Sequence, residues 1–332
     1  MAGTTHTSTP RTTRTVCIAG ASGTIGQAVV RECVARGFAV TALVRSEAAR
    51  SLDALAGAEV RVVDVEQQMD TSLAMAEIAP HVIISCIASR SGTPSDARAV
   101  DLDANMHLLI AGESQGVEHF VLLGAICVQR PLLAFQRAKL EFEAALKSSA
   151  IPHTIVRPTA FFKSVSGQVA RVAAGKPFLI FGDGELTRCK PISDADLARF
   201  IANTLGDPQA LGKELPIGGP GPAISPREQG EMLFELAGKP PRFKSISPRL
   251  FDAAAFVLGL GARVSSWCDE KAEYARIAKY YATQSMLLLD PETGEYSAAA
   301  TPEFGADTLR DHYAALMAKE LRAAQLSAET AA

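Results

Sequence analysis

Residues 15–26 read Thr-Val-Cys-Ile-Ala-Gly-Ala-Ser-Gly-Thr-Ile-Gly, an apolar run that breaks into three glycines before a helical pattern begins. The first glycine lets the chain leave a strand sharply, the second lets backbone N–H groups approach a pyrophosphate, and the third lets the helix pack closely. The dipole and unpaired N–H groups at the helix N-terminus favour the anion. The sequence therefore predicts a nucleotide-binding turn made by Gly20, Ser22, Gly23, Thr24, Ile25 and Gly26.

The residues after the glycines complete a strand–helix–strand unit. Positions 24–36 have a helical pattern that ends at Gly37, and 38–44 form a short apolar run typical of a buried strand. This length suits the right-handed crossover between two parallel strands. Three glycines alone would also fit a simple tight turn, so this context is what favours a dinucleotide site.

The spacing G-x-x-G-x-x-G resembles that of the extended and atypical short-chain dehydrogenases/reductases. Arg45 ends the second predicted strand, where NAD enzymes carry an acid for the ribose 2′-hydroxyl, and its planar guanidinium suits the 2′-phosphate of NADPH. We therefore expect NADPH as the cofactor; the alternative is a solvated arginine at a strand end. Resemblance to the same superfamily places Asp64, and with it Val65, beside the adenine at the end of a third strand, 59–65.

Strands and helices continue to alternate, which predicts an α/β chain with a doubly wound parallel Rossmann sheet and a smaller mixed α/β C-terminal substrate lobe. We expect a disordered leader at 1–14, the NADP-binding domain at 15–160, and the substrate lobe at 161–332, parts of which return to the sheet. The other predicted elements are strands at 81–88, 120–127, 154–157, 177–181 and 214–218, and helices at 105–116, 135–147, 194–205, 226–236 and 249–260.

Composition argues against several classes of protein. The net charge of −3 offers no basic face for a nucleic acid. No run approaches the ~18 apolar residues that a membrane-spanning helix needs, so no transmembrane segment is expected. The cysteines are scattered without a C-x-x-C pair, which predicts reduced thiols, no metal site and no iron–sulfur cluster; they are Cys17, Cys33, Cys86, Cys127, Cys189 and Cys268.

The catalytic pattern of the short-chain superfamily is only half present. Its Tyr-x-x-x-Lys should follow the fifth strand, where this chain reads Phe135-Gln-Arg-Ala-Lys139, and the partner serine or threonine is absent from 124–128. Carbonyl reduction needs a donor for the developing oxyanion, so the loss of both hydroxyls favours reduction of a conjugated carbon–carbon double bond. We expect Lys139 to hold the nicotinamide ribose and to be the catalytic residue. The alternative is a surface lysine in a non-catalytic NADP(H)-sensing regulator.

Several longer stretches resemble one family, the NADPH-dependent divinyl chlorophyllide 8-vinyl reductases of chlorophyll and bacteriochlorophyll synthesis, an atypical short-chain group related to isoflavone-reductase-like and NmrA-like proteins. The resemblance covers nearly the whole chain after Arg14. The Thr-rich, acid-free leader resembles a transit peptide, but its shortness favours a bacterial, cytoplasmic protein near photosynthetic membranes over a chloroplast precursor. The stretches are 122–128, 136–142, 155–164, 181–184, 189–193, 215–221, 280–282 and 289–296.

The resemblance implies that NADPH reduces the C8 vinyl group of divinyl chlorophyllide a or divinyl protochlorophyllide a to ethyl. A hydride delivered to the outer vinyl carbon leaves a carbanion spread over the macrocycle, so protein groups mainly position the ring. Phe161 and Phe162 stand where the superfamily places its substrate, although either could be core. Lys163, Arg188 and Lys190 are candidate partners for the substrate's propionate carboxylate, although each alone is more often a solvated charge.

The sequence does not assign the proton donor. His81, His107, His119 and His153 are candidates for it or for a magnesium axial ligand, but no spacing selects one. The apolar helix near 251–260 is expected to be a lid over the pigment or core packing, with peripheral membrane contact as the lesser alternative.

Two rival functions stay open beside the NADP(H) sensor. One is an isoflavone-reductase-like reductase of another conjugated alkene. The other is a nucleotide-sugar epimerase or dehydratase, which would need the tyrosine that Phe135 replaces. The oligomeric state is not predicted.

Overall fold

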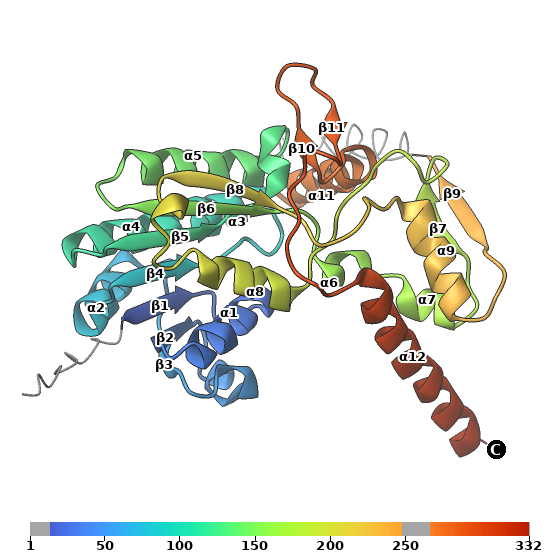
Figure 1. Ribbon diagram of the computed structural model, residues 1–332, viewed down its shortest axis with the longest axis horizontal. Coiled ribbons are helices and arrows are strands. Elements are labelled where there is room, and N and C mark those ends of the chain that lie inside the picture. Colours follow the sequence, from blue (N-terminus) through green and yellow to red (C-terminus); the bar gives the residue numbers. More distant parts are fainter. Residues whose placement is uncertain (1–13, 248–265, 332) are drawn as a thin grey trace, which may run out of the picture.

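The structure, a computed structural model, describes residues 14–247 and 266–331, without the side chains of 266–269 and 327–331. Its centre is a seven-stranded parallel sheet (Figure 1). The chain moves outward from β1 through β2 to β3 and then crosses back to β4, so the sheet has its switch point between β1 and β4. In order across the sheet the strands are β3 (Glu59–Val62), β2 (Ala39–Val44), β1 (Thr15–Ala19), β4 (Val82–Ser85), β5 (His119–Leu123), β6 (His153–Pro158) and β8 (Lys213–Ile217).

Helices cover both faces of this sheet (Figure 1). On one face, α1 (Thr24–Ala35) and α8 (Asp194–Asn203) bury apolar side chains such as Val29 and Ile201 against the strands. On the other face lie α2 (Gln68–Ile78), α4 (Asn105–Ser114) and α5 (Ala134–Ser148), with core residues Met75, Leu108 and Phe142. Two separate hydrophobic cores on the two faces confirm the predicted doubly wound α/β fold.

A smaller lobe continues beyond β6. Its own core gathers Phe178, Phe234 and Tyr313, which are almost fully buried. Helix α12 runs away from this lobe toward the C-terminus (Figure 1). The elements of the lobe and its connections are α6 (Phe162–Val165), α7 (Val169–Ala173), β7 (Phe178–Phe181), α9 (Pro226–Leu236), β9 (Phe243–Ile246), α11 (Ser266–Thr283), β10 (Leu288–Leu289), β11 (Tyr296–Ser297) and α12 (Leu309–Ala331).

Three strands end earlier than the apolar pattern predicts. β3 ends at Val62, β4 at Ser85 and β5 at Leu123, because the chain leaves the sheet there to form loops. After β5 the chain makes a short 3-10 turn, Ile126–Gln129, and a π-helical stretch, Ala97–Ala104, leads into α4. The strand predicted at 214–218 is β8 of the main sheet. The helix predicted at 194–205 is α8, which covers one face of that sheet.

Other sequence predictions fall partly outside the described residues. The helix predicted at 249–260 lies there, as do residues 1–13 of the expected leader. Arg14, the last residue of that leader, is ordered, because its guanidinium pairs with Glu118 at 3.1 Å and its carbonyl accepts the first hydrogen bond from β2. Helices α2, α11 and α12 were not predicted. The domain boundary near residue 160 stays a prediction.

The glycine turn fits its surroundings only without side chains. Gly20 has a left-handed φ of +76°, and a Cβ there would lie 2.8 Å from the backbone of Cys86 at the end of β4. A Cβ on Gly26 would lie 2.1 Å from the Gly20 carbonyl oxygen. Gly23 donates its N–H to that same oxygen at 3.0 Å, and a Cβ on Gly23 would lie 3.3 Å from it. The turn therefore joins β1, α1 and the end of β4 through backbone contacts.

We predict that Gly26→Ala lowers the free energy of unfolding by about 1–3 kcal/mol, the usual cost of overpacking, because the new methyl group forces α1 away from Gly20. It should also weaken NADPH binding. Urea titration and cofactor fluorescence measure the two effects. Gly167→Ala is the matched control, since a Cβ there meets nothing within 4 Å and the residue has no left-handed φ. Equal stability of the two variants would contradict the tight-packing role of Gly26.

Candidate active site

A cavity of about 720 Å³ opens at the carboxyl ends of β4, β5 and β6. Loops after these strands form one wall, and residues of the smaller lobe together with α11 form the other. The volume lies within the range of small-molecule sites, and ligands of doubly wound sheets bind at this edge. Three aromatic rings line it, those of Phe135, Phe161 and Tyr281. A flat apolar ligand therefore has both space and rings to pack against.

The predicted cofactor residues lie beside this cavity, on the edge formed by β1, β2 and β3. Ser22, Gly23 and Thr24 are exposed at the start of α1, whereas Ile25 and Gly26 are buried under them. The exposed N-terminus of α1 fits a bound pyrophosphate. These residues do not line the cavity itself, but Cys86, which does, contacts Gly20.

Arg45 follows β2 and exposes 59% of its side chain, with only a loose contact of 3.8 Å to Glu66. Its guanidinium is therefore available to a phosphate. Asp64 is exposed and accepts a hydrogen bond from the backbone N–H of Glu66 at 3.1 Å. The Val65 side chain is buried in the core, so only its backbone could face an adenine.

Lys139 lines the cavity and is held by a buried carboxylate that the sequence did not reveal. Its Nζ lies 2.8 Å from Oδ1 of Asp101, whose side chain is fully buried. The same oxygen accepts the backbone N–H of Ser89 at 3.2 Å, while Oδ2 has no partner among the described residues. Asp101 lies in the π-helical stretch, a feature that often marks functional sites and that the apolar periodicity of the sequence does not show.

Phe135 lies one helical turn before Lys139 and also lines the cavity, as their spacing on α5 predicts. Below it, the Cys127 carbonyl accepts hydrogen bonds from Gln136 Nε2 at 2.9 Å and from the Tyr280 hydroxyl at 2.8 Å. These bonds fix α5 and α11 against the end of β5. Burial raises the pKa of the Cys127 thiol, so it stays protonated near neutral pH.

The predicted substrate residues separate into different environments. Phe161 lines the cavity. Phe162 is 4% exposed and packs in the core of the smaller lobe, with its ring 5.2 Å from that of His312, which favours the core alternative for this residue. Lys163 donates to the Thr24 hydroxyl at 2.9 Å, so it lies at the start of α1 rather than in the cavity.

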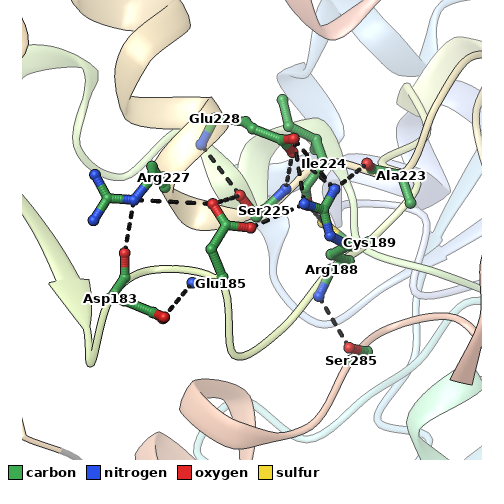
Figure 2. A network of polar contacts seen from close by, with 10 residues as sticks. All are labelled: Asp183, Glu185, Arg188, Cys189, Ala223, Ile224, Ser225, Arg227, Glu228 and Ser285. Carbon is green, nitrogen blue, oxygen red and sulfur yellow. Dashed lines mark hydrogen bonds and ion pairs between the residues drawn. The ribbon is translucent and has the colours of Figure 1, made fainter. Parts of the chain in front are cut away.

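Arg188 and Lys190 are both engaged by carboxylates. Arg188 lines the cavity, but its guanidinium pairs with Glu228 at 3.0 Å and Glu185 at 2.9 Å (Figure 2). Its backbone N–H donates to Ser285, which ties this loop to the segment after α11 (Figure 2). Lys190 is buried and pairs with Glu303. Both therefore stabilise the lobe wall, and neither is free to hold a carboxylate.

Arg90 is the cavity-lining cation that sequence reasoning missed. It is exposed on the loop after β4, and no carboxylate pairs with its side chain among residues 14–247 and 270–326. Only its place in a loop after a parallel strand could have suggested it.

The four histidines considered as proton donors or magnesium ligands do not line the cavity. His119 is buried against the Thr154 hydroxyl at 2.9 Å, and burial lowers its pKa to about 4. His81 bonds to the Thr15 hydroxyl, and His107 to the Val65 carbonyl. Burial also lowers the pKa of His153. Within the described part of the chain no cluster of acidic, histidine and cysteine side chains could hold a metal ion.

Comparison with known proteins gives the family. Residues 20–208 match a family model described as NAD(P)H-binding. A divinyl chlorophyllide a 8-vinyl-reductase from Cucumis sativus is 44% identical over 95% of this chain and 79% of its own length. The Zea mays protein of the same name is 45% identical, covering 97% of this chain and 84% of its own. The chain belongs to the divinyl chlorophyllide a 8-vinyl-reductase family.

Solved structures agree on the fold of this reductase family member. The NADPH-dependent quinone oxidoreductase QOR2 from Escherichia coli, complexed with NADPH, superposes with a TM-score of 0.66 at 18% identity, covering 91% of this chain and 99% of that one. At that identity the likeness concerns the fold alone. No helix in the described part of this reductase is long and apolar enough to cross a membrane.

The buried ion pair changes what we expect of Lys139→Met. The sequence alone predicts a loss of turnover with the fold intact, but removing the ammonium leaves Asp101 charged, buried and unpaired, at a cost of about 3–5 kcal/mol. We therefore predict that Lys139→Met is strongly destabilised and that adding Asp101→Asn recovers much of that loss. Thermal unfolding of the two variants checks this. A single variant as stable as the unmutated protein would contradict the buried pairing.

Proposed function

We propose that this chain reduces the C8 vinyl group of a divinyl chlorophyllide to ethyl with NADPH, in chlorophyll or bacteriochlorophyll biosynthesis. The observation that carries the proposal is the 44–45% identity to named 8-vinyl reductases along nearly the whole chain. The cavity supports it, because aromatic rings line the space beside the cofactor turn and Phe135 replaces the hydroxyl that carbonyl chemistry would need.

NADPH, when bound, supplies the hydride for this reaction. The N-terminus of α1 with Gly20, Ser22, Gly23 and Thr24 would hold the pyrophosphate, and Arg45 the 2′-phosphate. We propose that Lys139, fixed by Asp101, holds the nicotinamide ribose at the cavity wall. Asp64 and the Val65 backbone would border the adenine. Lys163, bonded to Thr24, would add positive charge at the pyrophosphate.

On the substrate side, Phe161 and Phe135 would orient the macrocycle by packing against its face. Arg90 would hold the propionate carboxylate, since it is the lining cation without a described carboxylate partner. Phe162 would act as core support behind Phe161. Whether the ring is divinyl chlorophyllide a or divinyl protochlorophyllide a is tested by the assay below.

The proposal also includes where the protein is located in the cell. Plant relatives are chloroplastic proteins, which supports the chloroplast alternative. A bacterial cytoplasmic location near photosynthetic membranes is our main proposal.

A non-catalytic NADP(H)-sensing role is the second candidate function, and a fixed Lys139 beside a cavity argues against it.

The direct experiment is an anaerobic assay with NADPH and each of the two divinyl pigments, read by chromatography. We expect the 8-ethyl product from at least one of them. NADPH binding without any product would favour the sensing role.

Arg45→Asp should weaken NADPH binding by roughly tenfold to a hundredfold and NADH binding far less, because it replaces a charged hydrogen bond to the 2′-phosphate by repulsion. Fluorescence titration with both nucleotides measures the effect. Arg50→Asp is the matched control, an exposed arginine six residues from β2. Equal affinity of the unmutated protein for both nucleotides would refute the assignment of Arg45.

Arg90→Gln should raise the KM for the free-acid pigment about tenfold or more while leaving the pigment methyl ester unaffected, because only the free acid carries the carboxylate that the guanidinium would pair with. Steady-state kinetics with the free-acid pigment and with its methyl ester measure the two KM values. An equal change for acid and ester would show that Arg90 acts on something other than the carboxylate.

A further inference from the structure

The proposed reduction needs a proton as well as a hydride, and the cavity contains one phenol in its described lining. Tyr281 lies on α11, in the part of the chain that the superfamily pattern does not use for chemistry. It exposes 48% of its surface and lines the cavity together with Phe135, Lys139 and Cys127. A side chain that is both exposed and part of the cavity wall can contact a ligand there.

The structure fixes α11 so that this phenol faces the site. Glu273 accepts the backbone N–H of Ala134 at 3.1 Å, which ties α11 to the start of α5. Ile277, one turn before Tyr281, also lines the cavity, and Gly92 leaves it room, since a Cβ there would lie 3.2 Å from Ile277. Tyr280 anchors the helix to the Cys127 carbonyl. The next residue, Tyr281, is thereby left on the cavity side.

The cavity combines Tyr281 with a lysine, as the superfamily's Tyr-x-x-x-Lys pattern does on the helix after the fifth strand. Its hydroxyl lies close to the Cys127 thiol, and the charge of Lys139 acts on that same thiol. A thiol, an ammonium and a phenol therefore meet in one cavity, although residue 135 has lost its hydroxyl. The phenol comes from α11 instead of α5.

The other hydroxyl and ammonium groups of the cavity are committed or weaker acids, and burial raises the pKa of the lining thiols of Cys86, Cys127 and Cys189. The Ser91 hydroxyl donates to Asp96 at 2.6 Å, and the Thr159 hydroxyl donates to the Lys190 carbonyl. Lys139 is held by Asp101. The remaining lining alcohols, those of Ser89, Ser164 and Thr187, are much weaker acids than a phenol. A phenol is protonated at neutral pH.

We propose that Tyr281 is the proton donor of the 8-vinyl reduction. The inference rests on the proposed function. Once NADPH has given a hydride to the outer vinyl carbon and become NADP⁺, the electron pair on the substrate forms a new C–H bond at the inner carbon with the Tyr281 proton. The Tyr281 O–H bond breaks, and water entering through the open face of the cavity returns the proton to the phenolate. The vinyl group thus gains one hydride and one proton.

The test compares Tyr281→Phe with Tyr274→Phe in the full-length protein. Tyr274 is the matched control, because it lies on the same helix, exposes 39% of its surface and does not line the cavity. We expect Tyr281→Phe to lower kcat about a hundredfold or more, as loss of a general acid does, with KM for pigment and NADPH within about twofold. Tyr274→Phe should stay within about twofold in all three constants.

A second measurement separates a catalytic role from a structural one. Pigment absorbance on binding to the NADP⁺ complex should be the same for Tyr281→Phe and the unmutated protein, and the solvent deuterium isotope effect should increase in the variant. Near-normal kcat in Tyr281→Phe, or loss of pigment binding, would overturn the assignment. Absence of product with the unmutated protein would instead refute the proposed function, and this inference with it.

Discussion

The close approach of the β1 turn to the end of β4 determines how this molecule is arranged. Gly20 has no side chain, and a Cβ there would lie only 2.8 Å from the backbone of Cys86. Gly26 lets α1 begin directly against the Gly20 carbonyl oxygen. The N-terminus of α1 and the wall of the cavity consequently share one edge of the sheet. A cofactor phosphate bound on one side of that contact and an aromatic ligand bound on the other would thereby be neighbours.

The site's chemistry follows from which polar groups this edge retains. An ammonium remains on α5, fixed by a fully buried carboxylate, while the hydroxyl one turn earlier is replaced by Phe135. No oxyanion has to be stabilised when a vinyl group conjugated with a large ring is reduced, because the ring disperses the charge. What the reaction still needs is orientation and a proton. We propose that the aromatic walls provide the first, and we assign the second to α11.

The sequence predicted what local pattern encodes. The alternation of strands and helices and the tight turn after β1 follow from local spacing in the sequence, and the structure confirms both. Contacts between distant elements were not predictable in this way. Asp101 reaches Lys139 from a π-helical stretch, and Glu228 and Glu303 neutralise Arg188 and Lys190 through tertiary contacts. Phe161 and Phe162 are adjacent in sequence, yet the turn into α6 leaves one at the cavity and the other in the lobe core.

The central claim is direct reduction of the vinyl group, with the macrocycle as electron sink. Its most direct test uses NADPH carrying deuterium at the transferred position, the divinyl pigment and the unmutated protein, with the product read by nuclear magnetic resonance. The account predicts a single deuterium on the terminal carbon of the new ethyl group, and solvent-derived hydrogen on the carbon next to the ring. Cofactor deuterium on the inner carbon, or none in the ethyl group, would contradict it.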